Sequence, residues 1–235
     1  MNKQEQLAEI QLIRTALNKV AMNYCQTQEE SKAIKDISLR LGNTETVLLA
    51  EVLSDKSNDI QVVDLGLTSG TLWTDRNIGA SSPEDAGDYF RFGETTPYTY
   101  NSPYEYEDIE GEISGTDRDA ATAILGKEYQ TPTRLQMKEL MDECTLEWTV
   151  LNGVVGVNVF GPNGNFIFMP AAGCRIYYRN SILGVGEKGV YWSASPYGNN
   201  RSRYMVFANG VNRDYWKIQS DNRGYAISIR AVKVL

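Results

Sequence analysis

The 235-residue chain contains no histidine. This absence excludes Ser-His-Asp and Cys-His catalysis, imidazole metal ligands and the usual proton shuttle near neutral pH. Cysteine is also scarce. Cys25, Cys144 and Cys174 lie far apart without a Cys-x-x-Cys spacing, so a zinc site is not expected. We expect free, buried thiols, with a Cys144–Cys174 disulfide as the alternative.

Long apolar runs and an excess of basic charge are missing as well. No stretch approaches the roughly 20 apolar residues that span a bilayer, so no membrane insertion is expected. The first six residues have no apolar segment behind their lysine, so no secretory signal is expected. A net charge of −7 disfavours nucleic acid as the main partner.

The charge is unevenly distributed along the chain. Residues 197–225 contain five Lys or Arg and two Asp, a net charge of +3. Residues 84–119 contain eleven acidic residues and two arginines, a net charge of −9. A near-neutral or basic surface on an acidic body favours steered binding of a polar partner. Two merely solvated loops are the alternative interpretation.

Residues 1–57 are predicted to form a small helical module. Apolar residues recur at helical spacing in Ile10, Ile13, Leu17, Val20 and Tyr24. A capping box at residues 27–30 predicts a second helix that ends at Gly42, and Asn43 or Thr44 can cap a third. Such short helices must pack on each other, on the main domain or on other copies of the chain. We therefore expect an attachment or oligomerisation module, followed by a linker at residues 54–59.

Residues 58–235 show strand patterns separated by turns, with few helices, which predicts an α+β domain. Helices are expected after Ser82-Pro83, at residues 117–125 and from the capping box at Thr133 to about Glu143. A hairpin is expected at residues 60–67 and 71–78. Further strands are expected at residues 89–92, 146–151, 154–160, 165–169, 190–195, 203–208, 211–217 and 225–233.

Three possible chemical motifs in the sequence are each incomplete. The stretch GVVGVNVFG lacks the GK[ST] ending of a phosphate-binding loop. The acidic run that includes Glu105 and Glu107 offers oxygen ligands for calcium, but it lacks the EF-hand spacing. Nothing in the sequence places two carboxylates across a cleft, as glycoside hydrolysis needs. No catalytic residue, metal ligand or cofactor is predicted.

The C-terminal tract, residues 189–235, is the most informative part of the chain. Residues 177–225 hold ten of its 24 aromatic residues. Two segments interleave Tyr and Trp with Arg, Asn and Asp, a composition typical of protein contact surfaces. Strand alternation should bury Trp192, Met205, Phe207, Ile227 and Ile229 beneath them. We predict one exposed ligand-binding patch made of Tyr197, Asn199, Asn200, Arg201, Arg203, Tyr204, Asn212, Arg213, Asp214, Tyr215, Trp216, Lys217, Asp221 and Asn222.

Four segments together resemble a known family. They are VDLGLTSGTLWTDRNIGASSPEDAGDYFRFGETTPY, TPTRLQMKELMDECTLEWT, GPNGNFIFMPAAG and the pair YWSASPY and GYAISIRAV. In this order they resemble the Fibrobacter succinogenes major paralogous domain, common in Bacteroidetes and their phages. The resemblance covers about residues 60–235. It implies a C-type-lectin-like fold and kinship with the variable proteins of diversity-generating retroelements, whose C-terminal region is mutated to change ligand specificity.

The sequence departs from this family and from its relatives at several points. The family often reads WATCNVGA where this chain has residues 73–80 without a cysteine. Many members carry a secretion signal, whereas this chain begins with predicted helices. The Glu-Pro-Asn and Trp-Asn-Asp calcium motifs of sugar-binding C-type lectins are absent. The reactive cysteine pair of the related formylglycine-generating enzymes is also absent. This absence disfavours an enzymatic function.

These observations predict a non-enzymatic ligand- or receptor-binding protein, diversified by a retroelement and encoded by a phage or a bacterium. Its ligand would be a protein or a glycan on a cell surface. It would be made in the cytoplasm and would reach a phage tail or the bacterial surface without a signal peptide. The N-terminal helices would attach it to a virion or form a homo-oligomer. The alternatives are an undiversified bacterial adhesive or structural domain, and an enzyme on the same fold.

Overall fold

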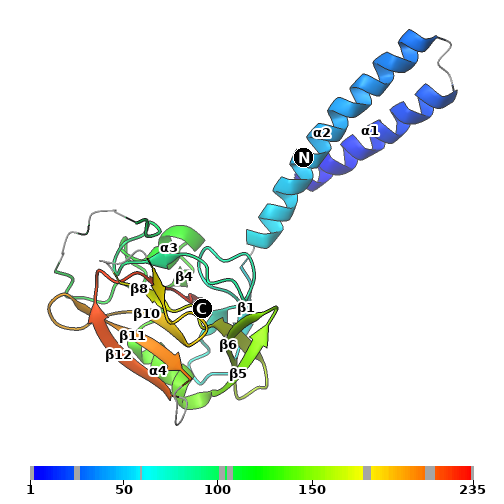
Figure 1. Cartoon of the computed structure of the whole chain (residues 1–235). Coiled ribbons are helices and arrows are strands. Elements are labelled where there is room, and N and C mark those ends of the chain that lie inside the picture. The colour runs from blue at the N-terminus through cyan, green and yellow to red at the C-terminus, as the bar shows by residue number, and fades with distance from the viewer. Residues whose placement is uncertain are drawn as a thin grey trace. The chain divides into compact units, whose positions relative to one another are not determined.

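The computed structural model describes residues 3–23, 27–58, 60–100, 104, 108–176, 181–209 and 215–233. The chain divides into two compact units, Met1–Asp59 and Ile60–Leu235. This division falls two residues from the boundary expected between residues 57 and 58. The described residues of the first unit form two helices, and the second unit is mixed α+β with several largely antiparallel sheets (Figure 1).

The first unit is a pair of helices, α1 (Lys3–Asn23) and α2 (Gln28–Asn58). The predicted capping box begins α2, since Thr27 Oγ1 accepts from the Glu30 amide and Glu30 accepts from the Thr27 amide. Neither helix, nor any other in the described residues, has the length and apolar content needed to cross a membrane.

The prediction that a helix ends at Gly42 was wrong, and so was the linker at residues 54–59. One helix continues through Gly42 to Asn58. Gly42 lies against Arg14 of α1, and an added Cβ there would come within 3.3 Å of Arg14 Cζ. A glycine inside a helix costs about 1 kcal/mol relative to alanine. Packing of α2 against α1 offsets this cost, because tertiary contacts supply most helix stability in proteins.

The second unit contains two helices and fourteen strands in its described residues. The helices are α3 (Ala120–Leu125) and α4 (Arg134–Glu143). The first strands are β1 (Val62–Asp64), β2 (Leu72–Thr74), β3 (Tyr89–Phe90), β4 (Tyr129–Gln130), β5 (Thr145–Leu151), β6 (Val154–Phe160) and β7 (Phe166–Pro170). The later strands are β8 (Cys174–Arg175), β9 (Ile182–Leu183), β10 (Lys188–Pro196), β11 (Arg201–Ala208), β12 (Tyr215–Asn222), β13 (Ile227–Ser228) and β14 (Val232–Lys233).

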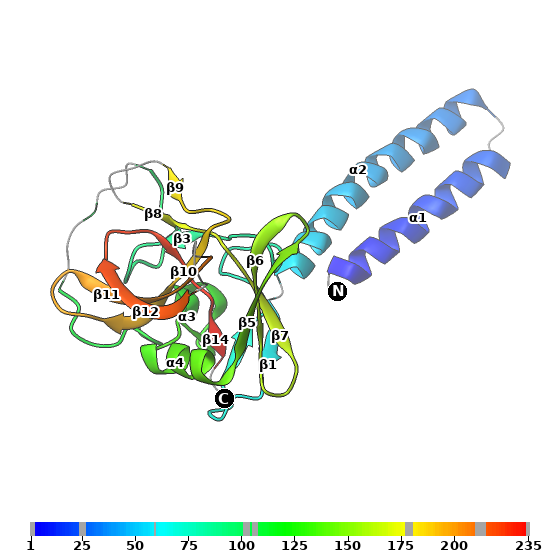
Figure 2. The ribbon, with the colours of Figure 1, turned by 60° about the horizontal axis from the view of Figure 1, so that its bottom comes forward.

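A five-stranded sheet in the order β12-β11-β10-β13-β3 forms the centre of the unit. Three smaller sheets surround it, with the orders β1-β2-β14-β4, β5-β6-β7 and β8-β9. Helix α4 contacts β10, β11 and β12 on one side, whereas β8 lies on the other side (Figures 1 and 2). The central sheet therefore has two differently covered faces.

Local hydrogen bonds explain which helices of the second unit form. Thr133 and Gln136 make the predicted capping box that begins α4. Asp119 caps α3 by accepting from the Ala121 amide, so this helix begins at Ala120 and not at residue 117, and it ends at Leu125 as expected. The helix predicted after Ser82 was wrong. There the Asp85 carboxylate accepts from the Ser81 and Gly87 amides, and this closes a turn instead of a helix.

The prediction of one strand over residues 225–233 was also incorrect. The segment contributes β13 to the central sheet and β14 to the β1-β2-β14-β4 sheet, and Arg230 lies between them. Arg230 is fully buried and donates to Asn77 Oδ1 (2.9 Å), to the Thr74 carbonyl (3.1 Å) and to the Phe168 carbonyl (2.9 Å). Burial lowers the pKa of this guanidinium to about 10. The buried arginine thus ties β14 to β2 and β7.

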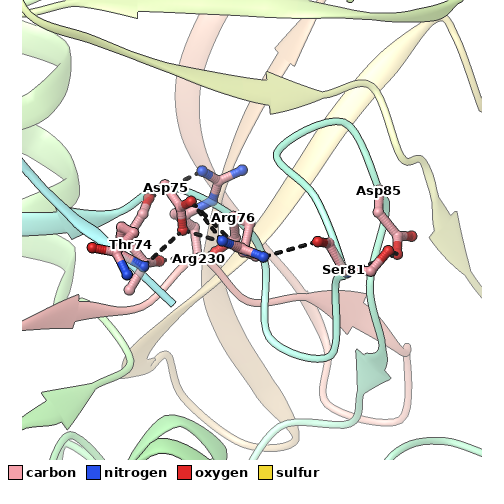
Figure 3. A network of polar contacts seen from close by, with 7 residues as sticks. Thr74, Asp75, Arg76, Ser81, Asp85 and Arg230 are labelled. Carbon is pink, nitrogen blue, oxygen red and sulfur yellow. Dashed lines mark hydrogen bonds and ion pairs between the residues drawn. The ribbon is translucent and has the colours of Figure 1, made fainter. Parts of the chain in front are cut away.

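A second, less buried arginine continues this polar network (Figure 3). Arg76 donates to both carboxylate oxygens of Asp75 and to the Ser81 carbonyl. The Ser81 hydroxyl in turn donates to Asp85. The network therefore connects the end of β2 to the turn that replaces the predicted helix, and it fixes the loop that leads into β3.

Candidate functional site

Strand register assigns each residue of the C-terminal tract to one face of the central sheet. Directly opposed residues of antiparallel strands point to the same face. Tyr204 opposes Gln219, and Val206 opposes Lys217. The intervening residues, such as Phe207 and its partner Trp216, point to the other face. We call the first the pocket face and the second the helix face, because α4 packs on it.

The pocket face forms the floor of a cavity of about 240 Å³. Val190, Val206 and Ile227 are buried and give it an apolar floor. Cys174 of β8 and Leu183 of β9 belong to its wall. Its full lining consists of Cys174, Ile176, Leu183, Lys188, Val190, Tyr204, Val206, Tyr215, Gln219, Asp221, Tyr225 and Ile227. The cavity thus combines an apolar floor with three tyrosines, one ammonium, one carboxylate and one amide.

The floor and one tyrosine of the wall are held in place by a buried tryptophan on the same face. The fully buried Trp192 donates from Nε1 to the Phe90 carbonyl (2.8 Å). Its ring meets the Tyr204 ring edge-on, with centroids 6.1 Å apart. The Tyr204 hydroxyl donates to Gln219 Oε1 (3.1 Å). Tyr204 is therefore held at its ring and at its hydroxyl, so the wall is ordered before any ligand arrives.

Two ionisable groups of the wall, Tyr204 and Cys174, favour their neutral forms. Burial, with the negative charge of Asp221, raises the pKa of Tyr204 to about 12. Burial also raises the pKa of the Cys174 thiol, although the nearby Lys188 ammonium opposes this shift. Cys174 is therefore a protonated thiol near neutral pH, and a thiol is a far weaker nucleophile than a thiolate. Within the described residues Cys144 and Cys174 are free, and Cys25 lies outside them.

Four of the predicted ligand-binding residues share the pocket face. Tyr204, Tyr215 and Asp221 line the cavity itself. Lys217 lies on the same face, and its ammonium is 4.6 Å from the centre of the Tyr215 ring. Tyr215 and Lys217 are both exposed. These four residues form the part of the predicted patch that the fold brings together.

A second group lies near the turn between β10 and β11. Arg201 and Arg203 point to the opposite side of β11 from Tyr204, by strand alternation. The Arg203 guanidinium lies 4.1 Å from the centre of the exposed Tyr197 ring. Asn199 is exposed in the turn. The single patch that we predicted is therefore divided between two faces of the sheet.

Two predicted contact residues instead stabilise turns. Asn200 has a positive φ of 54°, and its Oδ1 accepts from the Tyr104 hydroxyl (2.8 Å). Asn222 Oδ1 accepts from the Gly224 amide (2.8 Å) and closes the turn after β12. The predictions for Asn212, Arg213 and Asp214 lie outside the described residues.

The assignment of Trp216 to an exposed patch was wrong. Trp216 is half-buried and packs against the core formed by Met137, Leu140 and Phe207. Its indole Nε1 is buried and has no hydrogen-bond partner in the described part of the chain. The neighbouring Tyr215 is exposed, because successive strand residues point to opposite faces. Trp192, Met205, Phe207, Ile227 and Ile229 are buried, as we predicted. However, Trp192 and Ile227 lie on the pocket face with Tyr204 and not beneath it.

Sequence reasoning missed most of the cavity lining. Gln219 could have been found by alternation, because it lies on the same face of its strand as Tyr215, Lys217 and Asp221. Cys174 and Leu183 carried no such signal, since β8 and β9 were not predicted as strands. Lys188 was missed because it precedes the strand that we expected to begin at residue 190. The cavity is formed by residues that are distant in the sequence, from Cys174 to Ile227, so no local pattern brings them together.

No group of three or more Cys, Asp or Glu side chains in the described ranges is arranged to hold a metal ion. Glu105 and Glu107 of the acidic run lie outside these ranges. We compared the chain with family models, with curated proteins and with solved structures, and none of the three comparisons found a match.

Proposed function

We propose that the chain is a non-enzymatic ligand-binding protein that presents the pocket face of a C-type-lectin-like domain to a partner on a cell surface. The observation that carries this proposal is the composition of the cavity. Eight of its twelve lining residues belong to the tract 189–235, which the sequence singles out as rich in contact residues. The resemblance to variable proteins supports the same location for the binding surface.

The arrangement of the site favours binding over chemistry. The cavity wall offers a neutral thiol and a tyrosine whose pKa lies near 12, and neither is poised to donate or accept protons near neutral pH. Rigid tyrosines beside an ammonium and a carboxylate are typical of contact surfaces. The protein would hold its ligand by burial of apolar surface and by polar contacts at the rim.

The ligand that fits this cavity best is a protein that inserts one large apolar or aromatic side chain. A floor of Val190, Val206 and Ile227 offers apolar contact but no hydrogen bonds to sugar hydroxyls. The volume of about 240 Å³ lies below the roughly 300–1,000 Å³ of most small-molecule pockets. A single anchor side chain in a pocket, surrounded by polar contacts, is the usual form of a protein-binding hot spot.

The first experiment tests the cavity with defined probes. The full chain is titrated with N-acetyl-tryptophanamide, and with methyl glycosides in parallel, while methyl NMR signals of Val190, Val206 and Ile227 are followed. The aromatic amide should shift these signals. Gln219→Trp, which fills the mouth from an exposed position, should abolish the shifts, whereas Thr145→Trp on exposed β5 should leave them unchanged. Shifts with glycosides alone would instead identify a glycan ligand and overturn the side-chain assignment.

The second experiment tests binding as the function. Fluorescently labelled full-length chain is applied to a panel of intact Bacteroidetes cells. Saturable binding that falls at least tenfold in Gln219→Trp and persists in Thr145→Trp supports the proposal. Binding that is unaffected by Gln219→Trp, or absent from every cell type, overturns it.

Diversification of the tract is a separate part of the proposal, and it is tested in the encoding DNA. A retroelement would leave a near-copy of the last roughly 130 bases of the gene in the neighbouring DNA. The gene and the copy would differ mainly at positions where the copy has adenine. If the flanking DNA holds no such copy, an undiversified adhesive domain becomes the better interpretation.

A further inference from the structure

Among the described residues, Lys188 is the only basic side chain in the lining of the cavity. It begins β10 and is half-buried. Its stem lies against Gly184 in the turn before β10, where an added Cβ would come within 2.6 Å of Lys188 Cε. Gly184 has a positive φ of 78°, which also favours glycine at this position. The glycine therefore leaves room for the lysine stem in the cavity wall.

The Lys188 ammonium has no carboxylate partner. None of the ion pairs in the described part of the chain includes it. The ammonium instead lies beside the Cys174 thiol, where it opposes the rise of that thiol's pKa. A neutral thiol is only a weak hydrogen-bond acceptor. The charge of Lys188 is thus left to be balanced from the open side of the cavity.

Asp221, the carboxylate of the same lining, belongs to the other end of the pocket face. Strand register places Lys188 in the same row across the sheet as Tyr215. Asp221 follows Tyr215 by six residues of β12, or about 20 Å along an extended strand. It also accepts from the Asn222 amide (2.8 Å). The exposed Lys217 lies in the row next to Lys188, so this end of the face is basic.

A ligand that enters the cavity removes water from the Lys188 ammonium. A neutral ligand offers no compensation, and a charge that loses water without gaining a partner costs free energy. An anionic ligand group compensates with a charge-assisted hydrogen bond, which is stronger in a partly dry site. The apolar floor begins close by, because Val190 follows Lys188 by two residues on the same face, or about 7 Å.

On the basis of the binding role proposed above, we propose that Lys188 receives a carboxylate of the ligand while the adjacent floor receives an aromatic ring. The spacing of about 7 Å fits a carboxylate on the aromatic residue itself, as at a protein C-terminus, or on the residue beside it. The apolar floor accepts any large apolar side chain. Lys188 selects among them, because it disfavours those without a nearby anion.

Three probes with the same ring test this proposal. The full chain is titrated near neutral pH with N-acetyl-tryptophan, with N-acetyl-aspartyl-tryptophanamide and with the neutral N-acetyl-tryptophanamide, while the methyl signals of the floor are followed by NMR. At least one of the two acids should bind at least tenfold more tightly than the neutral amide. Preference for the first identifies a C-terminal carboxylate, and preference for the second identifies an acidic side chain.

A matched pair of variants assigns the preference to Lys188. Lys188→Met keeps a long stem and removes the charge, so the acids and the neutral amide should bind within about twofold of each other. Lys127→Met is the control. Lys127 is exposed in the turn between α3 and β4, so this variant loses the same charge and should keep the preference for the acids.

The possible failures are distinguishable. Equal binding of the acids and the neutral amide by the wild type overturns the carboxylate assignment but leaves the aromatic anchor intact. A preference that survives Lys188→Met, or that Lys127→Met also removes, overturns the role of Lys188. If none of the three probes binds, the aromatic anchor fails as well. The wild-type comparison decides the carboxylate assignment even if Lys188→Met does not fold.

Discussion

The two faces of the β10-β11-β12 layer are made by alternate residues of the same strands, yet they have different surroundings. On the helix face, Met205, Phe207 and Trp216 pack with residues of α4 into the core. On the pocket face, Tyr215 and Lys217 are exposed, and Tyr204 borders a cavity. Neighbouring residues such as Tyr215 and Trp216 therefore have opposite surroundings, although their side chains suggest the same role.

This difference shows how the domain can present contact residues without losing stability. The pocket face is anchored by the buried Trp192, which lies on that face beside Tyr204 and donates to the Phe90 carbonyl. The rim residues of the pocket face contribute little burial of their own, as Tyr215 is 39 % exposed. Changes at the rim should alter what is bound, whereas changes on the helix face should alter whether the domain folds.

The largest expected effect is the loss of Phe207 from the helix face. Its ring contacts those of Trp148 and Tyr191, with centroids 5.7 and 5.9 Å apart, and it is fully buried. Phe207→Ala should lower the free energy of unfolding by about 3–5 kcal/mol through a cavity in the core. Urea denaturation measures this loss. Phe166→Ala, at a site 51 % exposed, should cost less than about 1 kcal/mol, and equal losses would contradict the assignment of the core.

A smaller effect should separate the two adjacent aromatic residues. Trp216→Ala removes a half-buried ring from the core and should cost about 2 kcal/mol of unfolding free energy. Tyr215→Ala should change it by no more than about 0.5 kcal/mol, because exposed positions tolerate substitution. Thermal and urea unfolding of the two variants provide the comparison. If Tyr215→Ala proves the more destabilising, the strand register of β12 is wrong.

The smallest expected effect concerns the pH dependence of the pocket face. Burial raises the pKa of Tyr204 to about 12, so the folded chain keeps a proton that the unfolded chain loses near pH 10. This contribution to stability is full below about pH 10 and declines as the pH approaches 12. Replacing Tyr204 by Phe removes the hydrogen bond to Gln219 and should cost about 0.5–1.5 kcal/mol at neutral pH.

Spectrophotometric titration checks the origin of that effect. Tyr89, Tyr191 and Tyr204 all have pKa values raised to about 12 by burial. Tyr204→Phe should remove one tyrosinate from the step near pH 12 and leave the other two. Loss of a tyrosinate from the step near pH 10 would show instead that Tyr204 is solvated and that the cavity wall is misassigned.

The sequence by itself determined the features that rest on short-range interactions. The capping boxes at Thr27 and Thr133 join groups three residues apart, so residue type and spacing reveal them. Period-two alternation likewise placed Met205 and Phe207 on the opposite face of the sheet from Tyr204. The change from helical to strand periodicity located the division between the two units.

Only the tertiary structure decided which partner each element meets. Alternation separates Tyr215 from Trp216, but it does not say which of them faces α4, because that depends on contacts with a helix more than 70 residues away. Gly42 stays helical because α1 packs beside it. The cavity needs Cys174 and Leu183 to lie over the central sheet. Long-range packing sets all of these features, and no local pattern in the sequence encodes it.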